Sequence, residues 1–240
     1  MQRILVIIPI VTALFDEEVA REFSAVARPG TEVEVTHLTR GPASIESSYD
    51  EALATPEILE RVKSAEEQGF SGVVIDCFGD PGVRAARELV RIPVVGAGSP
   101  SMLLAAGMGH RFSVVSVLQN VVPILEDIAK LSGVEDKLAS VRSVNIPVLD
   151  LGDRQGLEGA LLREMAIAVE EDGAHVLVLG CTGMMGVAGS LQRALEARFG
   201  HFVPVVDPVG ASMAHLQGML AMNTSHSKLT YMDPPQKKRA

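Results

Sequence analysis

The chain has 240 residues, a net charge of −9 and 47% hydrophobic residues, but only 4% aromatic residues and no Trp. The hydrophobic content excludes extensive disorder, and the length allows one large domain or two modest ones. The acidic balance and the scarcity of aromatic side chains argue against a nucleic-acid partner, which requires a basic surface or stacking aromatics.

The apolar run at residues 4–15 follows Arg3 and superficially resembles a secretory signal peptide. Pro9 interrupts the run, acidic residues 16–18 follow it, and no cleavage site of small residues is apparent. The run is also too short to span a bilayer, so we expect a buried strand and its loop. Since no other segment is typical of a membrane span, the sequence predicts a soluble, cytoplasmic protein without a membrane partner.

Short apolar segments alternate along the chain with longer helical patterns. Strands are expected at residues 3–9, 32–37, 72–76, 93–96, 113–117, 142–146, 176–179 and 204–206. Helices are expected at residues 16–27, 56–68, 82–90, 122–131, 157–172 and 191–199. Several strands are nearly continuous Val, Ile and Leu, which is typical of parallel strands covered on both faces. The alternation predicts an α/β fold with mostly parallel sheets flanked by helices.

The sequence also contains an internal repeat. Residues 69–79 and 173–183 each form an apolar strand that ends in Cys-x-Gly, with a further glycine shortly after. Three landmarks recur in one order, with offsets between 104 and 111 residues: Arg3 and Arg111, Cys77 and Cys181, and Pro93 and Pro204. We therefore expect two pseudo-symmetric halves with the active site between them. Residues 1–97 plus 208–240 would form the first lobe, and residues 98–207 the second.

Cys77 and Cys181 are too few for a disulfide framework, so they are either inert core residues or chemical groups. Each lies at the end of a strand, where open α/β sheets bind ligands, and the duplication gives a reason for the two to converge on one cleft. A sulfur near a helix N-terminus is expected to have a pKa below its ordinary value. A thiolate and an opposing thiol are suited to inverting a stereocentre, because one removes a proton and the other returns one to the opposite face. The glycine loops would supply N–H groups for the developing enolate.

Other motifs carry less information. Cys77 and Arg84 are separated by six residues rather than the five of a phosphatase loop, and no Walker A or dinucleotide-binding fingerprint is present. The six histidines are scattered without ligand spacing, so neither a metal nor a cofactor is expected. Residues 41–47 form either a plain connector or a wall of the cleft, and the Ser116 hydroxyl either faces the cleft or caps a turn.

At these residues the chain resembles the hydantoin/allantoin racemase branch of the aspartate/glutamate/hydantoin racemase superfamily. The similarity covers nearly the whole length. The motifs that carry it lie at residues 40–46 (RGPASIE), 49–52 (YDEA), 77–82 (CFGDPG), 85–89 (AAREL), 111–115 (RFSVV), 180–184 (GCTGM) and 227–228 (SK).

The resemblance implies a cofactor-independent racemase in which Cys77 and Cys181 are the two acid–base residues. It implies that the substrate is a 5-substituted hydantoin or a similar cyclic ureide such as allantoin, and that the protein is a homodimer or larger homo-oligomer. The expected substrate-binding residues are Pro9, Ile10, Ile45, Phe78, Gly79, Ser116, Val117, Thr182 and Gly183.

Two departures from the family pattern bear on the substrate. Family members often carry Asn-Pro-Asn after the first strand, where this chain has Ile8, Pro9 and Ile10. They also often carry Glu-Ala where this chain has residues 98–100 (GSP). The apolar Ile10 suggests a hydrophobic 5-substituent.

Three alternatives to this reading are open. A racemase of aspartate or glutamate would need a cation or N–H groups for a second carboxylate, and the cysteine loops carry no dedicated Arg. Arylmalonate decarboxylases usually keep only one of the two cysteines. A two-lobed small-molecule binding protein with inert cysteines is the alternative from a different functional class.

Overall fold

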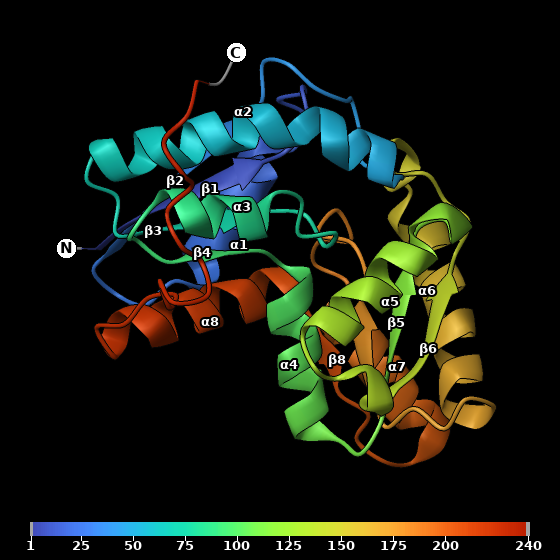
Figure 1. Ribbon diagram of the computed structural model, residues 1–240. Coiled ribbons are helices and arrows are strands. Elements are labelled where there is room, and N and C mark those ends of the chain that lie inside the picture. The colour runs from blue at the N-terminus through green and yellow to red at the C-terminus, as the bar shows by residue number, and fades with distance from the viewer. Residues whose placement is uncertain (1, 239–240) are drawn as a thin grey trace.

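The computed structural model describes residues 2–238, which form two four-stranded sheets (Figure 1). The first has the order β2-β1-β3-β4, with β1 (Gln2–Ile8), β2 (Thr31–His37), β3 (Gly72–Ile75) and β4 (Val94–Val95). The second has the order β6-β5-β7-β8, with β5 (Phe112–Ser116), β6 (Leu138–Ser143), β7 (Val176–Leu179) and β8 (Val205–Val206). All paired strands are parallel. The two halves therefore share one strand order, as the internal repeat predicts.

Helices cover both faces of each sheet. They are α1 (Asp16–Val26), α2 (Ser48–Glu67), α3 (Val83–Leu89), α4 (Gly98–Met108), α5 (Val122–Leu131), α6 (Arg154–Glu170), α7 (Ala188–Phe199) and α8 (Pro208–Ala221). Three short 3₁₀ helices lie at η1 (Gln119–Val121), η2 (Glu135–Lys137) and η3 (Val148–Asp150).

The central strand β1 illustrates why the strands read as unbroken apolar runs. Leu5 and Ile7 pack into a core cluster with residues of α2 and α3, whereas Ile4, Val6 and Ile8 pack into another with residues of α1 and α8. Successive side chains of a strand point to opposite faces, so a sheet covered on both faces requires apolar residues at every position.

Each half of the sequence contributes one helix to the other half. Helix α4 follows β4 of the first sheet but packs against α5, β7 and β8, whereas α8 follows β8 of the second sheet but packs against α1, β3 and β4. The two exchanged helices also pack against each other where the halves meet (Figure 1). We call the first sheet with α1–α3 and α8 the first lobe, and the second sheet with α4–α7 the second lobe. The proposed lobe boundaries, after residues 97 and 207, fall directly before α4 and α8.

Several predicted elements need correction. The strand expected at residues 142–146 is β6 at Leu138–Ser143, a half-buried edge strand whose polar residues hide its pattern. Helix α2 begins at Ser48 and continues through Pro56, where the sequence predicts its start. Helices α4 and α8 are not predicted at all. Neither carries an acidic or basic residue at either end, and both are packed on more than one side, which removes the one-sided apolar pattern of a surface helix.

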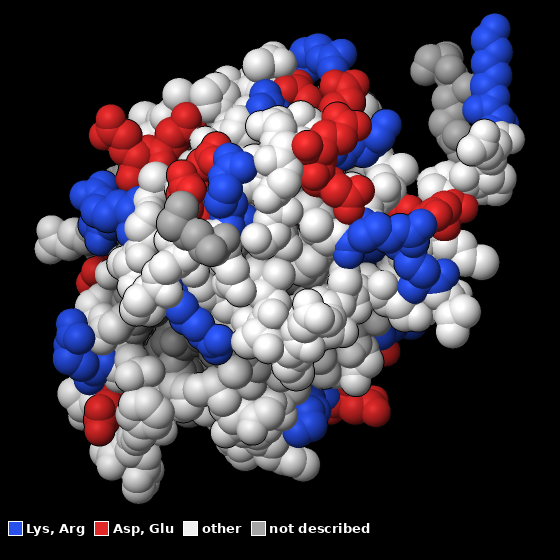
Figure 2. All heavy atoms as spheres, turned by 90° about the vertical axis from the view of Figure 1, so that its left-hand side faces the viewer, with Lys and Arg blue, Asp and Glu red and all other residues white. Residues whose placement is uncertain are grey.

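On the face of the molecule shown in Figure 2, basic and acidic side chains lie next to one another, and no broad basic patch forms there. Among residues 2–238, no helix is both long enough and apolar enough to cross a membrane.

Candidate active site

The two cysteines occupy matching loops of the two lobes. Cys77 comes two residues after the end of β3, and Cys181 two residues after the end of β7. Each loop turns through a glycine with a left-handed backbone, Gly82 and Gly186, both at φ 69°. A glycine adopts this conformation without the steric cost of a Cβ, so the further glycine that the repeat shares has a structural reason.

Both cysteines line one cavity between the lobes. Every predicted substrate-binding residue lines the same cavity: Pro9, Ile10, Ile45, Phe78, Gly79, Ser116, Val117, Thr182 and Gly183. The remaining wall is mostly apolar and includes Phe15, Val121, Ile124, Leu125 and Met185. Among the described residues, no Lys or Arg contributes to this wall.

The lobes interlock beside the cysteines. Phe78 follows Cys77 in the first lobe but is buried in the core cluster of the second lobe, and Met185 of the second lobe is buried in a core cluster of the first. The Thr182 hydroxyl of the second lobe donates a hydrogen bond to the main-chain oxygen of Asp76 in the first, at 3.2 Å. These contacts join the ends of β3 and β7, and therefore fix the two cysteine loops relative to each other.

The loop after β1 is fixed by main-chain hydrogen bonds to the loop after β2. The N–H of Leu38 donates to the Ile10 oxygen at 2.9 Å, and the N–H of Val11 donates to the Pro42 oxygen at 3.0 Å. Ile10 exposes only 6% of its surface. The structure therefore places an apolar side chain in the cavity wall at the family's asparagine position.

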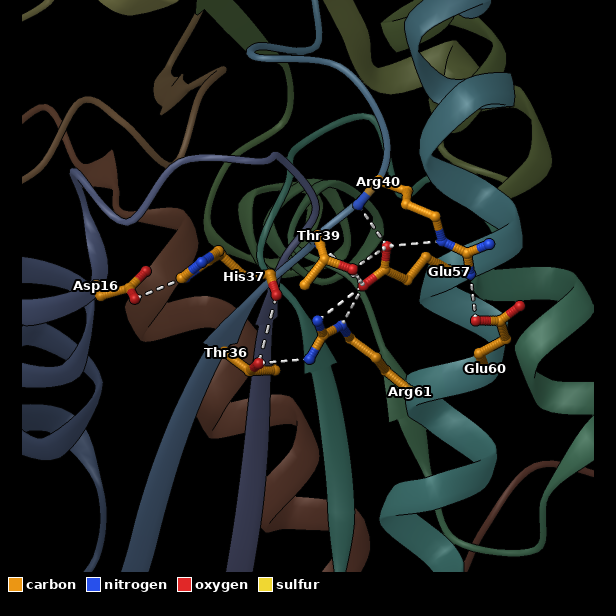
Figure 3. A network of polar contacts seen from close by, with 8 residues as sticks. All are labelled: Asp16, Thr36, His37, Thr39, Arg40, Glu57, Glu60 and Arg61. Atoms are coloured by element: carbon orange, nitrogen blue, oxygen red, sulfur yellow. Dashed lines mark hydrogen bonds and ion pairs between the residues drawn. The ribbon is translucent and has the colours of Figure 1, made fainter.

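A buried carboxylate organises the loop that carries Ile45 (Figure 3). Glu57 of α2 accepts hydrogen bonds from the main-chain N–H groups of Thr39 and Arg40, at 2.9 and 2.6 Å, and from Arg61 at 2.7 Å. Burial raises the pKa of Glu57, but these donors outweigh burial and lower its pKa to about 2. The loop is thus a wall of the cavity, anchored from outside, rather than a plain connector.

The N-terminus of α4, where residues 98–100 depart from the family pattern, docks on the Cys77 loop. Asp80 accepts hydrogen bonds from the N–H groups of Gly98 and Ser99, at 2.8 and 2.9 Å. A Cβ on Gly98 would lie 2.1 Å from the Phe78 main-chain oxygen. Only glycine allows this approach, so the residue holds the loop in place through close packing.

Ser116 lies in the wall, but its hydroxyl hydrogen is committed to the main chain. It donates to the Gly180 oxygen at 2.7 Å, and its side chain is almost fully buried. The hydroxyl therefore fixes the main chain beside Cys181 and has only acceptor capacity left for a ligand.

Two carboxyl groups in the cavity wall are missing from the sequence prediction. Asp76 exposes 4% of its surface, and its Oδ1 accepts no hydrogen bond from residues 2–238. The buried Oε1 of Glu51 likewise accepts no hydrogen bond from the described residues, and this oxygen lies where a Cβ on Gly79 would sit. An acidic residue at the end of an otherwise apolar strand is the signal that marks Asp76, because buried acids are rare. Within the described part of the chain, no group of three His, Cys, Asp or Glu side chains could hold a metal ion.

The predicted lowering of the thiol pKa values is wrong. Burial raises the pKa of Cys77 well above its ordinary value, although the Gly79 N–H opposes it. Burial likewise raises the pKa of Cys181 to about 12, against the N–H groups of Gly183 and Met184. The negative charge of Asp76 adds to both effects. Both thiols are therefore protonated at neutral pH, because removal from water outweighs the loop N–H groups.

Comparisons with known proteins agree on one family. The profile described as Asp/Glu/Hydantoin racemase matches residues 4–216. The hydantoin racemase of Pseudomonas sp. (strain NS671) is 37% identical over 238 residues, which cover 98% of this chain and 93% of that protein. The hydantoin racemase of Rhizobium meliloti is 40% identical over 206 residues, covering 85% and 83%. Among solved structures, the allantoin racemase from Klebsiella pneumoniae superposes with a TM-score of 0.92 at 35% identity, covering 100% of this chain and 96% of that one.

Proposed function

The chain belongs to the Asp/Glu/hydantoin racemase family, and on that premise we propose that it inverts the C5 centre of 5-substituted hydantoins, a class that includes allantoin. It is an enzyme that acts as a racemase. The proposal adds that Cys77 and Cys181 are the two acid–base groups. The observation that supports this role is that the matching cysteine loops of both lobes open on one cavity.

In the proposed step, one cysteine acts as thiolate and removes the proton from C5. The electron pair of the C–H bond moves to the adjacent C4 carbonyl and forms an enolate. The thiol of the other cysteine then protonates C5 on the opposite face. The first cysteine ends as thiol and the second as thiolate, so the protonation states of the pair are exchanged and the substrate is inverted.

The wall of the cavity supports a neutral cyclic ureide over aspartate or glutamate. A dicarboxylic amino acid needs cations or N–H groups for its two carboxylates, and no Lys or Arg lines the described cavity, whereas Asp76 and Glu51 do. Burying an unpaired carboxylate there would be costly. The buried Ile10 supports an apolar 5-substituent, as the sequence suggests.

The test is polarimetry of benzylhydantoin, isopropylhydantoin, allantoin, aspartate and glutamate with wild type, Cys77→Ala and Cys181→Ala. We expect the wild type to racemise the hydantoins, with the benzyl and isopropyl compounds preferred, and each variant to lose about 10²-fold to 10⁴-fold in rate. Each variant should still exchange the C5 proton of one enantiomer with deuterium, because one-face removal needs only one base.

Full racemase activity in either cysteine variant would rule out the two-base mechanism, provided circular dichroism shows an intact fold. Preference for aspartate or glutamate would rule out the ureide. Absence of turnover for all five compounds would instead favour the binding-protein alternative.

A further inference from the structure

Asp76 directly precedes Cys77 and lines the same cavity as both thiols. Its main chain is fixed, because its N–H donates to the Ile7 oxygen of β1 at 2.8 Å and its own oxygen accepts from Thr182. Its side chain lines the cavity and is 4% exposed, with Oδ1 unpaired among the described residues. A buried polar atom without a partner is costly and rare in folded proteins, so the position points to a ligand that completes it.

The surroundings of Asp76 favour its neutral form. Burial raises its pKa to about 7; the Thr182 hydroxyl opposes this, and the charges of Glu22 on α1 and Asp207 at the start of α8 reinforce it. Both thiols line the same cavity, and an ionised Asp76 opposes thiolate formation at both. A working thiolate is therefore most compatible with a protonated carboxyl at this position.

We propose, building on the ureide racemase function above, that the neutral Asp76 carboxyl binds the N3–H and C4=O edge of the hydantoin ring. The carboxyl O–H donates to the C4 oxygen, and the other carboxyl oxygen accepts from N3–H. A five-membered ring holds its amide in the cis form, so donor and acceptor lie side by side and match one carboxyl group. The C4 oxygen is also the atom on which the enolate charge develops.

The other polar side chains of the wall are less suited to this role. The hydroxyl hydrogen of Ser116 is committed to the Gly180 oxygen, and the Thr182 hydroxyl is committed to Asp76 itself, whose main-chain oxygen and carboxyl group it contacts. Glu51 lies against the Gly79 side of the Cys77 loop and raises the pKa of Cys77, not of Cys181. The residue before the second cysteine, Gly180, has no side chain, and a Cβ there would collide with Ser116 at 2.6 Å. The pseudo-symmetric cavity thus holds a carboxyl at only one of its two equivalent positions.

The first test compares Asp76→Asn with Asp76→Ala in racemisation of benzylhydantoin at pH 7. An Asn amide offers the same donor and acceptor as the neutral carboxyl, whereas Ala offers neither. We expect Asn to keep kcat within about tenfold of wild type, and Ala to lose about 10²-fold to 10³-fold, the usual cost of one oxyanion donor. An inactive Asn variant, or a fully active Ala variant, would overturn the proposal.

The second test is the pH profile of kcat/KM between pH 6 and 9, and it needs only the isosteric Asn variant. In wild type, the thiolate fraction rises tenfold per pH unit, but above about pH 7 the neutral fraction of Asp76 falls equally fast. For the wild type, kcat/KM should therefore rise with pH and then level off near pH 7. The amide of Asp76→Asn does not titrate, so kcat/KM of this variant should keep rising to pH 9. Superimposable profiles would contradict the role of the neutral carboxyl.

Glu22→Gln is the matched control, because Glu22 acts on Asp76 through its charge but does not line the cavity. Burial raises the pKa of Glu22 itself to about 7, so its charge is about half developed where the plateau begins. Removing that charge still lowers the pKa of Asp76, so the plateau should begin at a somewhat lower pH while benzylhydantoin is still racemised. An unmoved plateau would count against Asp76 as the titrating group. Failure of the proposed function itself is distinguishable, because then wild type would not racemise hydantoins or the cysteine variants would be fully active.

Discussion

Glu57 is a buried charge whose cost is offset by the donors that converge on it. It exposes 5% of its surface and joins α2 to the loop that carries Ile45 (Figure 3). We predict that Glu57→Gln lowers the free energy of unfolding by about 2–4 kcal/mol at pH 7, because an amide nitrogen faces donors that lose their acceptor. Urea unfolding followed by circular dichroism measures the difference.

The pH dependence of that difference has a definite sign. The folded pKa of Glu57, about 2, lies below its ordinary 4.5, so its stabilisation is present above pH 4.5 and is lost as pH falls toward 2. The difference in free energy of unfolding between wild type and Glu57→Gln should therefore decrease as the pH falls from 5 to 3. Glu60→Gln is the control, because its ion pair with Arg40 is exposed and contributes less than about 1 kcal/mol. A gap that stays constant with pH would contradict this assignment.

At the residue scale, the sequence predicts which residues line the cavity better than it predicts the pKa values of the groups in it. The nine wall residues that the resemblance implies and both cysteines line one cavity, and most of them lie at or just after the end of a strand. The thiol pKa values were mispredicted, because the sequence shows the glycine loops but not the depth of burial. Asp76 and Glu57 were missed for a related reason: whether an acidic residue is solvated or buried depends on packing between distant segments.

Among the elements, α4 connects the Cys77 loop to the second lobe. We predict that Gly98→Ala destabilises the protein by about 2 kcal/mol or more, because main-chain oxygen cannot move aside as a side chain can. It should also reduce racemisation, since the loop that must shift carries Cys77. Thermal unfolding and polarimetry of the same preparation measure both effects.

Gly107 in the same helix provides the contrast. A Cβ there meets nothing within 4 Å, and Ala is a better helix former, so Gly107→Ala should stabilise the protein by about 0.5–1 kcal/mol without changing activity. Equal effects of the two substitutions would show that helix propensity, not the approach to Phe78, governs α4. Both glycines help to explain why the sequence does not predict α4, because glycine is a poor helix former, but only Gly98 is required by close packing.

At the scale of the whole molecule, the duplication is readable from sequence but the exchange of α4 and α8 is not. Landmarks such as the two Cys-x-Gly loops are local, and local patterns survive in both halves. Which lobe a helix packs against depends on contacts with residues far along the chain, and α4 and α8 both leave the sheet they follow. The exchange has an energetic consequence, because neither lobe buries its full core without a helix from the other half of the sequence.

We therefore predict that the two lobes unfold as one cooperative unit. Leu161 of α6 is fully buried in the second lobe, and Leu161→Ala should cost about 2–5 kcal/mol. Hydrogen exchange followed by mass spectrometry should show protection falling by the same amount in peptides from β1 of the first lobe as in peptides from β5 of the second. Leu131→Ala is the matched control in the same lobe, because this leucine is 66% exposed and its loss should change protection little. If Leu161→Ala left the protection of β1 intact, the lobes would be independent despite the exchanged helices and the interlocked Phe78 and Met185.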